Sequence, residues 1–545
     1  MSDAIAGPGS DKPGGIGRAS AFLASGTIVS RILGFVKVIV LTAIIGAVGA
    51  TADTFSIANQ LPNTIYTIVA GGILTAVLVP QIVRATVHAD GGTAYINKLL
   101  TLALVILFTA TLAATLLAPV ITGFIGLNLP ENQKALAVAF AYWCLPQMFF
   151  YGLYTLLGEV LNARKSFGPF TWVPVLNNVV AIIGLVVFAA LFSPDPAGDR
   201  SAADITAAMV AILGGSATLG VIVQAVVLFY FWKRIGLRFR PDFHFRGVGL
   251  GTAGKLASWT FGMLLLTTFA GIVETQVVTL AHGKASVAVL ATAWLIFMLP
   301  HSVITVSVAT AYFTRMSEHA SLGNWALLKA DASSAIRGTS LLIVLAAAVI
   351  AVCAYPFAAV FVPFDQVPAV GNVILAFIVG LVPFCVLFVL QRTFYAIGDT
   401  RTPFFFTLFQ VVLLIGAVLA CSFLPTDTIA VGIAASITMT GTLQAILAAT
   451  LLRRRLGGID GRRILRSLVK YLVAAIIPVG LGLTVLGTLG VASTDDFAVA
   501  SRFTAMVSML LIGLVMTAAY FGLLLLMRSA ELTAFLTPLR ARLHR

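Results

Sequence analysis

Charged residues are scarce in this sequence: Asp, Glu, Lys and Arg make up only 10% of its 545 residues, whereas 59% are hydrophobic. This composition excludes a water-soluble domain and indicates an all-α integral membrane protein. Cysteine is scarce too, and Cys144, Cys353, Cys385 and Cys421 show neither metal-ligand spacing nor a disulfide framework. We expect these four to be packing residues.

Known enzyme signatures are also missing. The sequence contains no P-loop, no H-E-x-x-H motif and no recognisable nucleophile arrangement. We therefore expect no catalytic residues, no metal site and no bound cofactor. An ATP-driven pump would need a nucleotide-binding domain, so transport would instead be coupled to the membrane potential, to protons or to a monovalent cation.

Hydrophobic stretches long enough to cross roughly 30 Å of hydrocarbon recur along the chain and predict about fourteen transmembrane helices. The predicted spans are 19–47, 52–84, 97–125, 132–160, 170–192, 206–232, 255–282, 286–316, 329–358, 367–395, 403–424, 428–452, 467–490 and 499–528.

The basic residues are distributed very unequally between the two predicted sides. Of 34 Lys and Arg residues, four lie on one side (Lys134, Arg200, Lys284 and Arg502), Arg31 and Lys37 lie inside the membrane, and the others lie on the opposite side. Because cytoplasmic loops are the basic ones, this asymmetry predicts that both termini are cytoplasmic. It also accounts for the net charge of +14 without a nucleic-acid partner.

Two sequence features occur twice with nearly the same separation. Leu-Pro is centred at Pro62 and again at Pro300, and a turn ending in Pro-Phe occurs at Pro169 and at Pro403. We interpret this as a six-span unit present twice in the same orientation, which predicts two lobes in parallel repeat with a central cleft. The predicted organisation is a disordered tail (1–17), an N-terminal lobe (18–252), a C-terminal lobe (253–466), two further spans (467–530) and a basic tail (531–545).

Charged and polar residues inside predicted spans need a reason, because burying an ionisable group in a membrane is costly. In the first span, Ser30, Arg31 and Lys37 share one helical face, and in the second Asp53 and Asn63 do so. Two polar stripes on adjacent helices predict one wall of a water-filled cavity. Arg31 and Lys37 are candidates to bind an anionic headgroup, because guanidinium and ammonium groups suit phosphate oxygens. Alternatively, Arg31 extends to the cytoplasmic interface while Lys37 pairs with Asp53 as a structural bridge.

Glu274 lies in the seventh span, the repeat counterpart of the first. It is a candidate site for a coupling cation or proton. A helix-packing role, or a position near the outer interface, is the alternative.

The sequence resembles the MurJ (MviN) family of the MOP exporter superfamily. The resemblance rests on Ser30-Arg31-Ile32-Leu33-Gly34-Phe35, on Asp53 with Leu61-Pro62-Asn63, and on the segment from Phe394 to Pro403. It implies a flippase of the bacterial plasma membrane that moves lipid II, the undecaprenyl-pyrophosphate-linked peptidoglycan precursor, to the outer leaflet by alternating access. By position, Arg31, Lys37 and Asp53 match residues of the family's pattern, so we expect these three, with Ser30 and Asn63, to bind the substrate.

Membership would imply a role in peptidoglycan and cell-wall biogenesis and hence in cell shape. The implied partners are lipid II or a related polyprenyl-pyrophosphate lipid, membrane lipids and cell-wall synthesis proteins. Many members carry arginines where this chain has Tyr66, Thr67 and Leu295, so the predicted cavity is less basic than the family pattern.

Two other functions remain compatible with the sequence. One is a cation-coupled multidrug or other polyprenyl-lipid exporter of the same superfamily, which Glu274 favours and Arg31 and Lys37 disfavour. The other is a membrane scaffold for cell-wall enzymes, for which a dry interface between the lobes would be expected.

Overall fold

The computed structural model describes residues 13–69, 93–164, 166–236, 239–244 and 254–533. Within these ranges every regular element is helical, and thirteen helices are long and apolar enough to cross a membrane. The predicted all-α fold is confirmed, whereas the count of fourteen spans is not. The second predicted span, 52–84, extends into 70–84, which lies outside the described residues, and its described part is the polar helix α2 (Ala50–Val69).

The first half of the described chain forms the helices that we call the N-lobe. They are α1 (Pro13–Ile45), α2, α4 (Thr93–Leu116), α5 (Ala118–Ile125), α6 (Glu131–Cys144), α7 (Gln147–Ala163), α8 (Phe167–Leu191) and α9 (Ala207–Arg234).

The C-lobe comprises the next set of helices. They are α10 (Gly254–Val278), α11 (Val287–Pro300), α12 (Val306–Ser321), α13 (Trp325–Val352), α14 (Ala354–Phe361), α15 (Val367–Ile378), α16 (Leu381–Ala396), α17 (Arg401–Cys421) and α18 (Ile429–Leu456). Short 3-10 turns lie at Ala202–Asp204, Thr279–Ala281, Phe364–Gln366 and Thr426–Thr428, and a π-helical segment at His301–Thr305.

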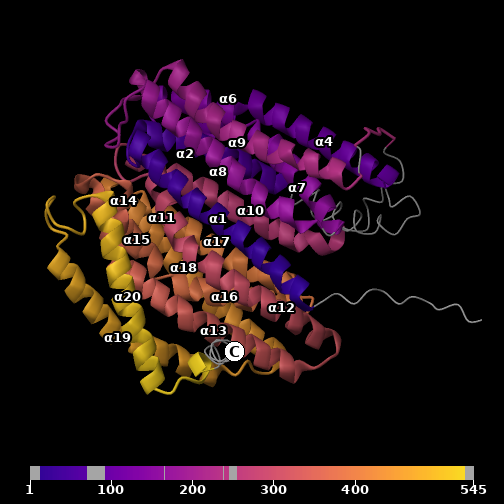
Figure 1. Cartoon of the computed structure of the whole chain (residues 1–545), viewed down its shortest axis with the longest axis vertical. Coiled ribbons are helices and arrows are strands. Elements are labelled where there is room, and N and C mark those ends of the chain that lie inside the picture. The colour runs from indigo at the N-terminus through magenta and orange to yellow at the C-terminus, as the bar shows by residue number, and fades with distance from the viewer. Residues whose placement is uncertain (1–12, 70–92, 165, 237–238, 245–253, 534–545) are drawn as a thin grey trace, which may run out of the picture.

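The two lobes repeat the same helix pairings. In the N-lobe, α1 packs on α8, α2 on α6, and both α7 and α8 on α9; in the C-lobe, α10 packs on α17, α11 on α15, and both α16 and α17 on α18. The lobes lie one above the other in Figure 1. These pairings support the internal repeat, although the predicted boundary at 252/253 falls outside the described residues.

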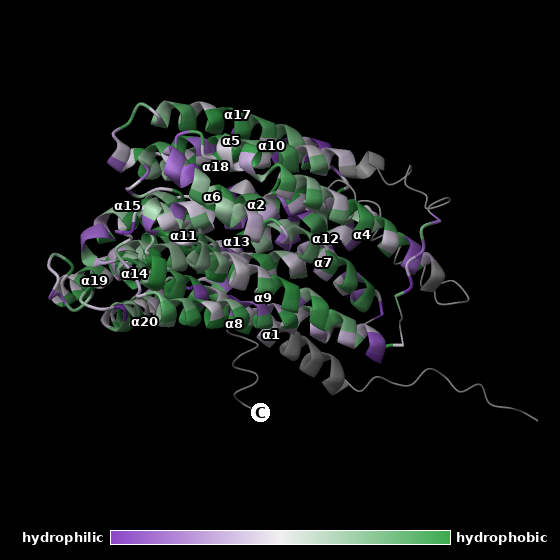
Figure 2. Ribbon diagram, turned by 90° about the horizontal axis from the view of Figure 1, so that it is seen from above, coloured by the Kyte–Doolittle hydropathy of each residue, from purple (hydrophilic) through white to green (hydrophobic). Residues whose placement is uncertain are grey.

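Small residues let helices approach closely within a lobe. A Cβ placed on Gly184 of α8 would lie only 2.1 Å from the Cβ of Ser216 on α9, so a larger side chain would force the two helices apart. Figure 2 shows apolar residues along most of the helix lengths and polar residues mainly at helix ends and in loops. All four cysteines are buried and unpaired, as expected of packing residues.

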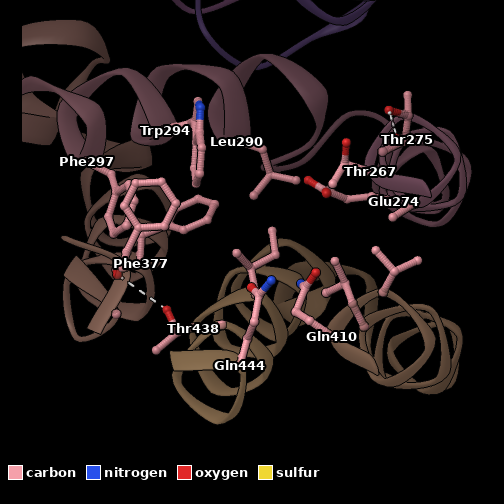
Figure 3. Close-up of a pocket in the computed structure, with 18 of the residues that line it drawn as sticks. Thr267, Glu274, Thr275, Leu290, Trp294, Phe297, Phe377, Gln410, Thr438 and Gln444 are labelled. Carbon is pink, nitrogen blue, oxygen red and sulfur yellow. Dashed lines mark hydrogen bonds between the residues drawn. The ribbon is translucent and has the colours of Figure 1, made fainter. Parts of the chain in front are cut away.

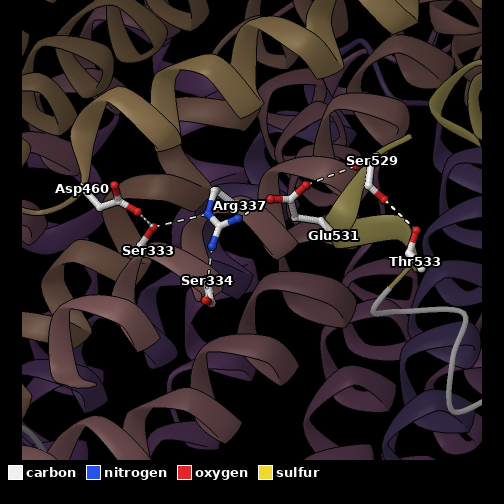
Figure 4. Close-up of polar contacts among 7 residues, drawn as sticks. All are labelled: Ser333, Ser334, Arg337, Asp460, Ser529, Glu531 and Thr533. Carbon is white, nitrogen blue, oxygen red and sulfur yellow. Dashed lines mark hydrogen bonds and ion pairs between the residues drawn. The ribbon is translucent and has the colours of Figure 1, made fainter. Parts of the chain in front are cut away.

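Two last helices, α19 (Gly461–Leu489) and α20 (Arg502–Leu526), lie beside the C-lobe, where α19 packs on α13 and α20 on α14 (Figure 1). Their junction with α13 is polar (Figure 4). The guanidinium of Arg337 forms an ion pair with Glu531, and its Nε donates to the hydroxyl of Ser333 at 3.3 Å. The hydroxyl of Ser333 donates in turn to Asp460 at 3.0 Å. This network fixes the segment after α20 to the C-lobe.

The loops divide into two ends of the helix bundle. The turns after α5, α8, α10, α14 and α17 form one end, which we call the acidic end because it carries Glu131, Asp195, Asp199, Asp365 and Asp427. The turns after α9 and α18 lie at the other, basic end, with Lys233, Arg234 and Arg453 to Arg455.

Candidate functional site

A cavity of about 700 Å³ lies in the C-lobe, where α10, α11, α15, α16, α17 and α18 face one another (Figure 3). We call it the C-lobe cavity. Its lining includes Thr267, Glu274, Thr275, Trp294, Phe297, Phe377, Phe384, Gln410, Thr438 and Gln444, and α2 contributes Gln60. A volume of this size suits a small organic ligand or part of a larger one.

Glu274 is the one charged side chain among the described residues that line this cavity, so the cavity contains an acid and no base. Figure 3 shows its carboxylate directed into the cavity, beside Thr267 and facing Gln410. We find no hydrogen-bond partner for it within the described chain. The proposed alternative of a helix-packing residue bonded to a neighbour is thus not what the structure shows, while a cation-binding role remains a prediction.

The other end of the cavity is aromatic. The indole of Trp294 is stacked on Phe297 with ring centroids 5.0 Å apart, and it meets the edges of Phe377 and Phe384. Its side chain is nevertheless 37% exposed, because it borders the cavity. The cavity therefore offers an aromatic surface at one end and oxygen atoms at the other.

A second, polar cavity of about 530 Å³ lies between the lobes, bordered by α2 and α10. Asn63, predicted as a substrate contact, lines it together with Thr64, Thr67 and Thr268. Gln60 lines this interlobe cavity and the C-lobe cavity, and also a smaller one of about 220 Å³ between α1, α2 and α11. A dry interface between the lobes, as expected of a scaffold, is not observed.

Helix α1 carries two cations without counterions. Arg31 is exposed and Lys37 half-buried, and in the part of the chain that the structure describes neither has a hydrogen bond or an ion pair. The alternative of a Lys37–Asp53 bridge is therefore not formed. His301, which follows α11, contacts Phe384 of the C-lobe cavity with ring centroids 4.8 Å apart. Ser30, next to Arg31, accepts a hydrogen bond from Asn178 through its backbone oxygen at 2.9 Å.

Asp53 occupies a different environment from the hydrated one that its polar stripe predicts. It is only 1% exposed, and its Oδ1 accepts the backbone N–H of Ala288 in the first turn of α11 at 3.0 Å. The first N–H groups of a helix lack partners within the helix and carry partial positive charge, so a carboxylate is stabilising there. Asp53 thus caps a helix of the opposite lobe, which a single-helix periodicity argument does not reveal.

Three further hydrogen bonds join the lobes at the acidic end. Gln276 donates to the backbone oxygen of Phe124 at 2.8 Å and accepts through its own backbone oxygen from Asn128 at 2.7 Å. Gln366 donates to the backbone oxygen of Ala197 at 2.9 Å. With the Asp53 contact, these bonds hold the lobes together at this end.

Sequence reasoning did not identify Trp294, Gln410 or Gln444 as site residues. A signal was available for the glutamines, because amides inside apolar spans are uncommon and usually face a cavity or another helix. Trp294 gives no such signal, since an aromatic residue in an apolar helix is ordinarily a packing residue.

Two lobes with matching helix pairings, cavities in and between them, and charged groups at membrane depth define the class: a two-lobed membrane transporter. A sequence model described as "Lipid II flippase MurJ" matches residues 41–507. The chain therefore belongs to the MurJ family.

Curated relatives agree. A protein of Rickettsia prowazekii named "Probable lipid II flippase MurJ" is 26% identical over 73% of this chain and 76% of its own. One of Haemophilus influenzae with the same name is 25% identical over 83% and 89%.

Solved structures share the fold. A lipid II flippase MurJ in an inward closed conformation matches 92% of this chain and 99% of its own with a TM-score of 0.70 and 16% identity. An inward-facing multidrug resistance MATE transporter of the MOP superfamily covers 79% of this chain and 96% of its own, with a TM-score of 0.63 and 16% identity.

Proposed function

We propose that this protein moves lipid II from the cytoplasmic to the outer leaflet of the bacterial plasma membrane by alternating access. The observation that carries the proposal is the family match over residues 41–507, reinforced by relatives named as probable lipid II flippases. The protein is a transporter rather than an enzyme, since moving a lipid between leaflets neither makes nor breaks a covalent bond.

The acidic end faces outward and both termini are cytoplasmic. The unequal distribution of basic residues supports this orientation, because short cytoplasmic loops carry the excess of Lys and Arg. In this orientation the four interlobe hydrogen bonds close the outer side, so a headgroup would enter from the cytoplasm.

Arg31 and Lys37 bind the pyrophosphate, with Ser30 and Asn63 as further contacts. Two uncompensated cations on one helix are an expensive arrangement in a membrane protein, and an anionic ligand would neutralise them. Arg31 offers a planar pair of donors that fits two phosphate oxygens, whereas Lys37 offers a single charged centre.

Asp53 acts on the conformational equilibrium instead of contacting the lipid. Opening the outer side separates α2 from α11, so the Asp53 carboxylate has to leave the N–H of Ala288. Because the contact exists in one state only, it stabilises that state selectively, and its strength contributes to the balance between the two states.

Glu274 is the site of coupling to a monovalent cation or a proton. Its carboxylate lacks a counterion and shares the cavity with oxygen atoms of Thr267 and Gln410, and oxygen ligands suit hard cations. Transport by the purified protein in vesicles with an imposed sodium gradient, proton gradient or membrane potential shows which of these drives it.

A cation-coupled multidrug exporter is the second candidate. It is favoured by one observation, the solitary acid in the C-lobe cavity, within a fold that MATE transporters share. The unpaired Arg31 and Lys37 disfavour it, since they would repel cationic drugs. Cell-wall synthesis proteins and membrane lipids are further proposed partners.

Depletion of the protein in its native bacterium tests the proposal. We expect lipid II to accumulate and to become resistant to an impermeant enzyme that cleaves lipid II from outside, because it stays in the inner leaflet. Re-expression of the wild-type chain should restore cleavage. Unchanged outer-leaflet lipid II after depletion would contradict the proposal, and drug sensitivity in its place would favour the exporter.

A further inference from the structure

Three hydroxyls of the C-lobe cavity already use their donors within the protein. Each donates to a backbone oxygen: the hydroxyl of Thr267 to Met263 at 3.1 Å, that of Thr275 to Gly271 at 2.8 Å and that of Thr438 to Ala376 at 2.8 Å. What these hydroxyls retain for a ligand is their lone pairs.

Two glutamines add amide groups to the cavity. The Nε2 of Gln410 donates to Thr440 at 3.4 Å and that of Gln444 to Thr407 at 3.2 Å, so each amide keeps one N–H and its oxygen. We find no partner for either amide oxygen within the described residues, and Figure 3 shows both amides directed into the cavity. Since the carboxylate of Glu274 accepts too, three strong acceptors from α10, α17 and α18 surround one space.

A cavity with an acid and no base among its described residues repels anions. The pyrophosphate of the lipid and the carboxylates of its peptide would meet like charge and find no cationic donor there. A compatible ligand brings donors of its own and carries no negative charge.

The aromatic end of the cavity further limits which ligands fit it. A pyranose ring has a face of C–H groups that can lie on an indole and a rim of hydroxyls that can donate to acceptors around it. Trp294 supplies the exposed aromatic surface, and polar groups from three helices suit hydroxyls placed around a ring.

We propose that the C-lobe cavity is a sugar-binding subsite, in which Trp294 covers the apolar face of a pyranose ring of the headgroup and the oxygens of Gln410 and Gln444 accept from its hydroxyls. The inference rests on the proposed function, because it assigns part of the same lipid. Gln60 lines both this cavity and the small cavity that α1 borders, so the sugar and pyrophosphate regions adjoin.

Binding of three lipids to the purified full-length protein in lipid nanodiscs tests the subsite. The probes are undecaprenyl pyrophosphate, the same lipid carrying the disaccharide without peptide, and complete lipid II. Trp294→Ala should weaken binding of both sugar-bearing lipids about tenfold and leave undecaprenyl pyrophosphate unchanged within about twofold. Gln410→Met, which removes the acceptor at similar length, should act in the same direction.

Trp325→Ala is the matched control, because Trp325 lies in the first turn of α13, outside the cavity, and is 48% exposed. It should alter none of the three affinities.

Three results would overturn the subsite: an equal loss for all three lipids with Trp294→Ala, a loss confined to the peptide-bearing lipid, or no loss with either cavity variant. Failure of the wild-type protein to bind any of the three lipids would instead refute the proposed function, so the two failures are distinguishable.

Discussion

Helix α1 and the C-lobe cavity have opposite chemistry although they lie in lobes built on the same helix pairings. In the described part of the chain, Arg31 and Lys37 of α1 are cations without partners, whereas in the cavity Glu274 is an acid without a partner among neutral polar groups. The repeat therefore preserves the packing of the helices and leaves the polar residues free to differ. A headgroup that joins an anionic pyrophosphate to neutral sugars would match both regions at once.

The difference is sharpest at equivalent helices of the repeat. Helix α1 and its counterpart α10 pack on α8 and α17 in the same way, yet the first carries the two cations and the second carries Glu274. Variants of these helices should therefore fail in different ways.

Arg31→Ala should have the largest effect. A strain depleted of its own flippase should not grow when this variant is the only copy supplied. Arg31→Lys keeps the charge but loses the paired donors, so partial growth is expected. Lys37→Ala should also reduce growth severely. This chain has Tyr66 and Leu295 where many family members have arginines, so no other cation there would replace Lys37. Complementation at matched membrane levels measures this. Normal growth and normal lipid II export with both alanine variants would contradict the pyrophosphate site.

Glu274→Gln tests the acid of the C-lobe cavity. The amide keeps the size of the side chain and removes the charge, so the cation or proton dependence of transport should be lost while undecaprenyl pyrophosphate binding is retained. We expect the rate under an imposed gradient to fall about tenfold, corresponding to about 1.4 kcal/mol in the barrier. Trp325→Ala, at a residue outside the cavity, serves as the control. A Glu274→Gln protein with undiminished gradient dependence would exclude this coupling site.

Asp53→Asn should change the balance between states without removing either binding region. Replacing a charged acceptor at a helix N-terminus by an amide costs on the order of 1 kcal/mol. The outward-open population should rise about fivefold. The outward-open population can be measured by labelling a Thr292→Cys variant with an impermeant thiol reagent, since Thr292 lines the small cavity next to α2. The native cysteines are buried and should not react. Equal labelling with and without Asp53→Asn would show that the contact does not hold the outer side closed.

The smallest effect concerns Glu531, which lies outside both regions. Burial raises the pKa of this carboxyl, but hydrogen bonds to its own backbone N–H and the charge of Arg337 outweigh burial and leave the pKa below its usual range. A depressed pKa means that the ion pair stabilises the fold above about pH 4.3 and that this contribution is lost as the pH falls through the lowered value.

We expect a loss on the order of 1 kcal/mol at most, because this is a single, partly buried ion pair in which the Glu531 side chain is 16% exposed. Proteolysis of the segment after α20 should increase as the pH falls, and Glu531→Gln should remove that pH dependence. Lipid II export by the Glu531→Gln protein should stay near the wild-type rate; a loss like that of Arg31→Ala would mean that this network belongs to the transport machinery.

Much of the fold was predictable because apolar length dictates membrane spans. The predicted span 170–192 became α8 (Phe167–Leu191), and 403–424 became α17 (Arg401–Cys421). Interruptions inside spans were not predicted. The span 132–160 is broken between α6 and α7 next to Pro146, and 367–395 between α15 and α16 at Gly380, which the average hydropathy of a long segment does not register.

The candidate site was less predictable because its contacts cross the lobes. The polar stripe of α2 correctly marked a face that borders cavities at Gln60 and Asn63. It did not reveal that Asp53 would bind a backbone group 235 residues away. Helical periodicity assigns a residue to a face, and only tertiary packing determines whether that face meets water or another helix.

Lipid II movement by the purified protein in vesicles tests the central claim most directly. With labelled lipid II placed in one leaflet, its appearance in the other is followed for the wild-type chain, for Arg31→Ala and for protein-free vesicles. The account predicts rapid movement with the wild-type chain and movement near the protein-free background with Arg31→Ala. Wild-type vesicles that move lipid II no faster than protein-free ones under every imposed gradient would contradict it.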